Sequence, residues 1–496
     1  MSTTNAEPTT ELKAAPKPKS GVRVALEYTG IPPSWLDKRP KLPSRNWLIF
    51  LTVTTSVASY YIYDRRECKR IRRSYAERVE HLAQEPLASS DMPRKVTVYG
   101  CKWPGDEEYD RSMKYFRKYV KPVLVAAAVD YEMVNGRRFG DLANRIADEI
   151  KERRRVEAGV EEPPQILMQL PNQPTPEMRR QRVLDGGIVL VGRHTFKEFM
   201  TGLKRGWTDS MEKTDREESL AQELASDGRF DEPAEPDDNL GEMDGEPIPT
   251  QSRLPSSRNA ALFSPIQVPP PGSSAGSQQT SSVPSYLDTP PATIPPLPPL
   301  LLVPFINHIG FKQMPRMIWG FFNERHKVRA GSEAGYRLVM KQTRPFAAPN
   351  PLNTSLSEME ESAQSTQPES STQGGDLDFG LDAEPYYHKF FTPEEIEKAR
   401  KGYYEGLPAK LEVARTLARG TREPTKEEMS HPPPTEVELR AERLKKEMRW
   451  RGDLGGWDIL KPGQPVAWDD RFTNALRVFE EPSPYVDVSV GNSTDN

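Results

Sequence analysis

The residues that come closest to a chemical site lie in the stretch LVGRHTFKEFMTGL, from Leu190 to Leu203. The apolar run GIVLVG at 187–192 predicts a short strand, and the residues after it have helical spacing. A glycine at a strand end lets backbone N–H groups approach a phosphate closely, and the N-terminus of the following helix favours negative charge. We refer to this stretch, which sits at a strand end and opens a helix, as the candidate loop.

The rest of the sequence carries no other familiar catalytic pattern. It lacks the motifs G-x-x-x-x-G-K-[ST], G-x-G-x-x-G, H-E-x-x-H and G-x-S-x-G. Its six histidines are scattered without ligand spacing, and Cys68 and Cys101 form no C-x-x-C pair. We therefore expect no catalytic residue, no metal site, no cofactor and no disulfide scaffold, and the net charge of -4 gives no reason to expect a nucleic acid partner.

Three strand–helix units would position the candidate loop. Strands are predicted at 96–101, 123–134 and 187–192, and each is followed by apolar residues at spacings of three and four. Such units in a row predict a parallel α/β sheet with covering helices. On the last helix we expect the ring of Phe199 to be buried, whereas Arg193 and His194 in the loop should be exposed.

The uncharged run WLIFLTVTTSVASYYIY, from Trp47 to Tyr63, is the other prominent feature. A helix needs ~17–25 mainly apolar residues to cross a bilayer, with aromatic rings at the two interfaces. The run therefore predicts one transmembrane helix whose ends are Trp47 and Tyr63. A buried core helix is the alternative, because the Thr and Ser content lowers the hydrophobicity. Basic residues crowd 65–73, where they would suit the anionic head groups of membrane lipids or form a solvated turn.

Composition predicts long unfolded stretches between the ordered parts, because the chain has 49 prolines and only 35% hydrophobic residues. The predicted segments are a flexible arm (1–44), the transmembrane helix (45–63), a basic juxtamembrane helix and linker (64–93), the α/β domain (94–207), a disordered acidic and Pro/Ser-rich insertion (208–298), an apolar segment returning to the core or to the membrane surface (299–342), a low-complexity linker (343–384), and a C-terminal helical region with a tail that lies on a surface (385–496).

The candidate loop resembles the nucleotide loop of the diacylglycerol-kinase-like lipid kinases, in which a GGDGT loop precedes a helix with a Glu and then a Gly. The matching positions are Gly192, Thr195, Glu198 and Gly202. The departures are Val191, Arg193 and His194, which replace two glycines and the aspartate. The resemblance thus implies a related fold for 94–207 and a degraded loop that has lost the chemistry.

A broader resemblance rests on three motifs in a fixed order. They are GIPPSWLDKRPKLPSRNW before the apolar run, VTVYGCKWPGD after it, and VPFINHIGFKQMPRMIWGFFNERHK further on. This order resembles the Tim54 family, membrane-anchored subunits of the mitochondrial carrier translocase, over roughly 28–207 and 299–345. The resemblance implies a single-pass inner-membrane protein whose large domain faces the intermembrane space. It also implies partners, namely a channel-forming translocase subunit, small intermembrane-space chaperones and inner-membrane lipids.

Two functions remain open from the sequence. The first is a non-catalytic subunit that assembles and docks the translocase inserting multi-spanning carrier proteins. The alternative is a membrane-bound lipid kinase of the diacylglycerol or acylglycerol kinase type that works with a degraded loop.

Overall fold

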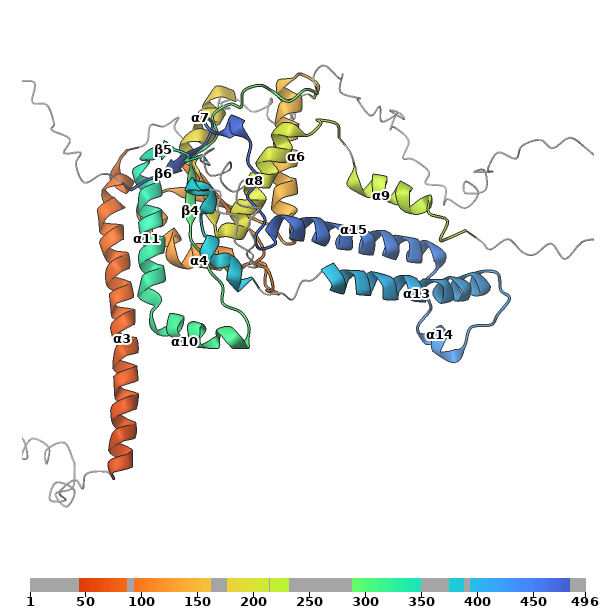
Figure 1. Cartoon of the computed structure of the whole chain (residues 1–496), viewed down its shortest axis with the longest axis horizontal. Helices are drawn as coiled ribbons and strands as arrows, with labels where there is room; N and C mark the ends of the chain where they lie inside the picture. The colour runs from red at the N-terminus through yellow and green to blue at the C-terminus, as the bar shows by residue number, and fades with distance from the viewer. Residues whose placement is uncertain are drawn as a thin grey trace, which may run out of the picture. The chain divides into compact units, whose positions relative to one another are not determined.

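The computed structural model describes residues 44–86, 93–161, 176–213, 215–231, 288–348, 374–387 and 393–481 (Figure 1). The chain divides into two compact units, Met1–Tyr63 and Asp64–Asn496. Most of the predicted N-terminal arm, 1–43, lies outside the described residues. In the first unit the described part is Ser44 and the first half of helix α3 (Arg45–Val79).

A six-stranded sheet organises the second unit. Its strands are β1 (Lys95–Gly100), β2 (Asp130–Asn135), β3 (Ile188–Val191), β4 (Leu300–Val303), β5 (Thr343–Pro345) and β6 (Arg477–Phe479). Their order is β2-β1-β3-β4-β6-β5, and every neighbouring pair is parallel except β5 with β6. The predicted α/β class with a mainly parallel sheet is therefore confirmed.

Helices cover both faces of this sheet. They are α4 (Arg111–Tyr119), α5 (Lys121–Ala126), α6 (Asp141–Glu157), α8 (Arg193–Thr208) and α11 (Glu324–Met340). Helix α7 (Pro176–Gly186) leads into β3 and has exposed apolar side chains. Val189 and Val191 join the core that contains α4, α5 and α11, whereas Leu190 between them joins the core of α6 and α8. This alternation follows from the two-residue period of a strand, and burial on both sides explains why the central strands are continuously apolar.

Close packing of α6 on α8 depends on a small residue. A Cβ added at Gly202 would lie only 2.7 Å from the carbonyl oxygen of Ala143 and 3.0 Å from the Cβ of Ile146. The predicted core position Phe199, on the same helix, is buried against the ring of Tyr99, as expected.

The predicted strand at 123–134 is wrong in its first half. Residues Lys121–Ala126 form helix α5, with a proline in its first turn, and the strand begins only at Asp130. Ala128 has a φ of 55°, a left-handed conformation that ends the helix before the chain turns into the sheet. A short apolar run cannot be assigned to helix or strand from periodicity alone.

The predicted transmembrane helix at 45–63 is not supported. The run is helical, but within the described ranges no helix combines the length and the hydropathy needed to cross a bilayer. Hydroxyl side chains lower its hydropathy; those of Thr52 and Thr54 donate to backbone carbonyls one turn back, at 2.8 and 2.9 Å. The expected end residues Trp47 and Tyr63 are 59% and 56% exposed. Helix α3 continues past Tyr63 to Val79, and Cys68 and Ile71 pack with residues of α4 and α11.

Two segments predicted to be unstructured contain ordered elements. Within 208–298, residues Arg216–Ala225 form α9, which Asp215 caps, and 288–298 contributes side chains that pack against the core. Within 343–384 lie β5 and the short 3-10 helices η5 (Gly375–Asp378) and η6 (Leu381–Tyr386). The remaining parts of these two predictions, 232–287 and 349–373, lie outside the described residues.

The apolar segment at 299–342 has two different environments. Strand β4 and helix α11 belong to the core, whereas the 3-10 turn η4 (Phe311–Gln313) and helix α10 (Met314–Phe322) have no buried residue. The two ends of the segment thus lie in the core, whereas its middle does not, and for that middle the predicted alternative of a membrane surface stays a prediction.

The C-terminal region is helical, as its composition indicates. Helices α13 (Pro393–Ala418) and α15 (Glu436–Leu460) pack against each other as a hairpin (Figure 1). The short helix α14 (Lys426–Ser430) lies in the connection that joins them. Thr435 and Glu438 form a capping box at the start of α15. The expectation of a surface tail is wrong, because the 3-10 turn η7 (Asp470–Phe472) buries Phe472 and β6 enters the sheet.

Candidate functional site

The candidate loop lies at the position where open α/β sheets bind ligands. Strand β1 has β2 on one side and β3 on the other, so the order in which strands are added to the sheet reverses between β1 and β3. Ligands of such sheets bind in the crevice at the carboxyl ends of these strands. Here those ends lead into Cys101 and Gly192, so the candidate loop lies at the end of a central strand.

Gly192 makes the sharp turn from β3 into α8. Its φ of +85° lies in the region that favours glycine, and a Cβ there would be 2.7 Å from the His194 ring. The Thr195 hydroxyl donates to the carbonyl of Val191 at 2.8 Å, within the first turn of α8. The turn from β3 into α8 therefore requires a glycine, and the residues that follow it carry large side chains.

His194 fills the crevice instead of leaving it open. Its side chain is fully buried, and its Nε2 lies 3.2 Å from the carbonyl oxygen of Cys101. Burial lowers the pKa of His194 to about 4, so the ring is neutral near pH 7. Rings surround it: Trp103 lies 5.2 Å from the His194 ring, and Phe305 and Tyr387 lie 5.4 and 5.1 Å from Trp103.

Arg193 is buried in an ion cluster at the mouth of the crevice. Its guanidinium pairs with Glu384 of η6 and donates to the carbonyls of Leu377 and Phe379 at 3.1 and 2.9 Å. The Lys197 ammonium lies 2.6 Å from the same carboxylate. Burial acts to raise the pKa of Glu384, but hydrogen bonds from Lys197, the Gly463 amide and Arg193 outweigh it and lower that pKa.

Glu198 accepts hydrogen bonds from the backbone at the start of a neighbouring helix. Its buried carboxylate accepts from the amides of Gly140 and Leu142, at 3.0 and 3.2 Å, at the start of α6. Burial raises its pKa to about 7 in spite of these bonds. Gly202, the last of the predicted loop positions, lies at the contact of α8 with Ala143 and has no part in the crevice.

The predicted positions from Gly192 to Glu198 lie in the turn and the first turns of α8, whereas Gly202 lies apart from them. The exposure predicted for Arg193 and His194 is wrong. Arg193 and His194 are 3% and 0% exposed, because the segment 374–387 and the aromatic rings cover them. Their hydrogen bonds are directed to carbonyls and carboxylates of the chain itself. Among the residues that the structure describes, no group of three metal-ligating side chains occurs either.

Comparison with known proteins identifies the family. The family model described as "Inner membrane protein import complex subunit Tim54" matches residues 24–376. The chain belongs to the Tim54 family.

Relatives of the family extend the similarity further along the chain. A Cryptococcus neoformans protein named mitochondrial import inner membrane translocase subunit TIM54 is 38% identical over 95% of this chain and 96% of its own length. Proteins of the same name from Candida albicans and Aspergillus oryzae are 30% and 29% identical, over 69% and 62% of this chain and 90% and 68% of their own lengths. The resemblance stated from the sequence motifs is confirmed, and nothing in these comparisons supports the lipid kinase alternative.

The match to the Tim54 family model ends inside the segment that covers the crevice. It includes the loop at Gly192 and strands β1 to β5, but it stops before Glu384. Glu384 and its partner Lys197 are site residues that sequence reasoning missed. One signal could have pointed to the covering segment, because Phe379, Tyr386 and Tyr387 break the Ser- and Gln-rich composition of the residues before them.

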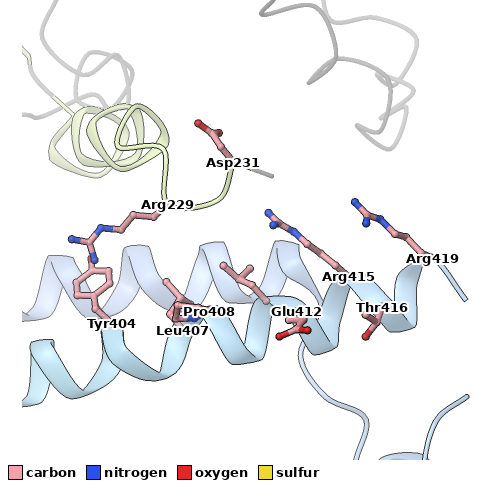
Figure 2. Close-up of a pocket in the computed structure, with 10 residues that line it drawn as sticks. Arg229, Asp231, Tyr404, Leu407, Pro408, Glu412, Arg415, Thr416 and Arg419 are labelled. Atoms are coloured by element: carbon pink, nitrogen blue, oxygen red, sulfur yellow. The ribbon is translucent and has the colours of Figure 1, made fainter. Parts of the chain in front are cut away.

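A second hollow of this Tim54-family chain lies on the C-terminal hairpin. It has a volume of about 670 Å³, and α13 and the segment after α9 line it (Figure 2). Two arginines connect α13 to the segment after α9. Arg415 donates to the carbonyl of Phe230 at 2.6 Å, and the guanidinium of Arg229 lies 3.9 Å from the centre of the Tyr404 ring. The hollow is therefore explained by packing of α9 and its exit against the hairpin.

Proposed function

We propose that this chain is a non-catalytic subunit of the mitochondrial inner-membrane translocase that inserts multi-spanning carrier proteins, and that it acts in assembly and docking of that complex. Membership of the Tim54 family supports the translocase role, since the named relatives are import subunits of the inner membrane. The observation that carries the non-catalytic part is the crevice filled by the chain's own side chains.

A nucleotide could reach the loop only after several buried contacts had been broken. The segment 374–387 would have to release the Arg193–Glu384 pair, and Trp103 would have to leave the crevice. Removing one partner of a buried ion pair costs ~3–5 kcal/mol, which a weakly bound nucleotide does not offset. The sheet and its closed crevice act as a rigid scaffold, and the outer helices offer surfaces to partner proteins.

The proposed partners are the channel-forming subunit of the translocase and the small chaperones of the intermembrane space. The second unit, Asp64–Asn496, faces that space and works at the surface of the inner membrane. Protease added to mitochondria with an opened outer membrane should then cleave this unit. Protection of a C-terminal tag under those conditions, with the inner membrane intact, would reverse the proposed orientation.

The non-catalytic role is tested by nucleotide binding to the purified full-length chain. Titration with ATP and Mg²⁺, followed by calorimetry, should give no saturable heat. The variant Trp103→Ala is the matched control, because it opens space beside His194 without adding a phosphate ligand. Saturable binding by the unaltered chain would contradict the scaffold role and would restore a ligand site at the end of β3.

The translocase role is tested in mitochondria depleted of their own Tim54-family subunit. Expression of this chain should restore the assembled complex on native gels and the insertion of a carrier precursor. Import of a matrix precursor should stay unchanged throughout. Full restoration of carrier insertion by an empty vector, or none by this chain when it is present at normal amount, would contradict the proposal.

A further inference from the structure

Helix α10 and the turn before it form an exposed apolar surface on an otherwise well-packed unit. Met314, Met317, Ile318 and Phe321 follow the spacing of one helix face, and all are exposed. Beside this face, Trp319 is 70% exposed, and Phe311 in η4 is 85% exposed. Large apolar side chains gathered in this way on a soluble unit mark an interaction surface.

The charges around this surface are of one sign. No acidic residue occurs between Pro299 and Asn323, whereas Lys312 and Arg316 lie in η4 and α10. The first acid after α10, Glu324, is buried and pairs with Arg65 and Lys118. Within this stretch of sequence the apolar face is thus accompanied by cations and by no exposed acid, which complements an anionic partner.

A buried aspartate ties α10 to the second half of α3. Asp64 is fully buried, and its carboxylate accepts from the amides of Glu324 and Arg325 at 3.1 and 3.3 Å, where α10 gives way to α11. Arg65 donates to the carbonyl of Phe321 at 3.4 Å. Asp64 is also the residue that follows the apolar run 47–63 in the chain. The C-terminal end of α10 is thus anchored to α3.

We infer that η4 and α10 (Phe311–Phe322) form an interfacial membrane-binding element that seats the second unit on an anionic lipid surface. The apolar face enters the boundary between head groups and acyl chains, Trp319 lies at head-group level, and Lys312 and Arg316 contact lipid phosphates. The inference rests on the proposed location at the inner membrane, but it does not require any particular translocase partner.

A lipid surface fits these residues better than a protein groove. A helix that binds in a groove presents a narrow row of anchors, whereas here Phe311, Trp319 and the α10 face expose apolar rings over more than one side. More cations lie nearby on the same unit, since Arg66, Lys69, Arg70 and Arg73 of α3 are exposed. Each such residue near an anionic surface adds to the attraction.

The test places a fluorescent probe on α10 of the full-length chain. Both native cysteines are buried, so a thiol-reactive, environment-sensitive dye will react with an added cysteine. Ile318→Cys carries the probe, and Val437→Cys on α15, an apolar position that is 76% exposed, is the matched control. Vesicles are made of phosphatidylcholine alone or with phosphatidylglycerol, and some contain nitroxide-labelled lipid as a quencher.

The expected result is a blue shift and nitroxide quenching of the probe at position 318 on phosphatidylglycerol vesicles, with little change at position 437. Lys312→Glu should weaken this response, and Trp319→Asp should reduce vesicle binding through α10 roughly tenfold or more, since a buried large apolar side chain is worth that much. Both substitutions are at exposed positions, so melting temperature should stay unchanged.

Three outcomes would overturn the inference. They are an unshifted probe at position 318, an equal shift at both positions, and a shift that requires added inner-membrane proteins, which would make α10 a protein interface. The vesicles contain no translocase and no carrier precursor. Failure here is therefore distinct from failure of the proposed function, which the import experiment measures.

Discussion

Replacing Glu384 with glutamine should destabilise the fold more than any other single change in the crevice cluster. The native cluster contains two buried cations, Arg193 and Lys197, around one buried carboxylate. Glu384→Gln keeps the shape of the side chain and the bond from the Gly463 amide at 2.9 Å, but it removes the negative charge. Two cations would then face each other without compensation, at a cost of ~3–5 kcal/mol.

The two cations should not respond equally. Lys197→Met leaves the neutral Arg193–Glu384 pair intact and removes an ammonium whose pKa burial already lowers, so its cost should be about 1–2 kcal/mol. Arg193→Met leaves the Lys197–Glu384 pair, but the carbonyls of Leu377 and Phe379 lose their donor, at ~1–3 kcal/mol for each one that stays buried. The expected order of cost is Glu384→Gln, then Arg193→Met, then Lys197→Met.

The decisive measurement is the double variant Glu384→Gln with Lys197→Met. Removing the second cation relieves the repulsion, so the double variant should be more stable than Glu384→Gln alone, by ~1–3 kcal/mol of coupling. Thermal unfolding of the full-length chain, with protease cleavage within 374–387 as a local readout, gives the four stabilities. Costs that simply add, or a Lys197→Met variant as unstable as Glu384→Gln, would refute the charge reasoning.

Three further predictions test the packing around the crevice. Phe199→Ala should lower the free energy of unfolding by ~3–5 kcal/mol, seen by thermal unfolding, because this core ring is 2% exposed. Gly202→Ala should cost ~1–3 kcal/mol through its clash with Ala143, whereas the control Gly402→Ala, with nothing within 4 Å, should be neutral or stabilising. The folded pKa of Glu198, about 7, lies above its ordinary 4.5, so its stabilising contribution is complete below pH 4.5 and is lost as pH rises through 7. Between pH 4.5 and 7 the free energy of unfolding of the native chain should fall by up to about 3 kcal/mol relative to that of Glu198→Gln. Parallel profiles of unfolding free energy against pH for the two proteins would contradict this.

The central part of the fold could be predicted because its signals are local. Strands β1 and β3 and the helix after β3 show their periodicity within a dozen residues, and so the loop at Gly192 was placed correctly at a strand end. The three-residue strands β5 and β6 carry no such signal. They exist because the chain returns over a long sequence distance to pair Arg344 with Val478, which no local pattern encodes.

The exposure of the loop could not be predicted for the same reason. Arg193 and Glu384 are 191 residues apart in the sequence. Most of the residues between them are predicted to be unstructured, and only the aromatic residues near Glu384 indicate that the chain returns to the sheet. A basic residue at a strand end and an acidic residue in a polar linker each predict a solvated side chain when considered alone. Only their contact in the fold makes both of them buried.

The closed crevice and the exposed helix have a common physical logic. At the end of β3, where a related fold would leave room for a ligand, this chain places two cations around one carboxylate and aromatic rings in contact, so the position contributes to stability. At α10, the chain leaves apolar rings exposed although each would gain free energy from burial. In this chain the polar side chains at the end of β3 bind one another rather than a ligand, while an apolar surface at α10 stays exposed. This combination is typical of a protein that binds an extended surface. We therefore expect its function to depend on surfaces rather than on a catalytic pocket.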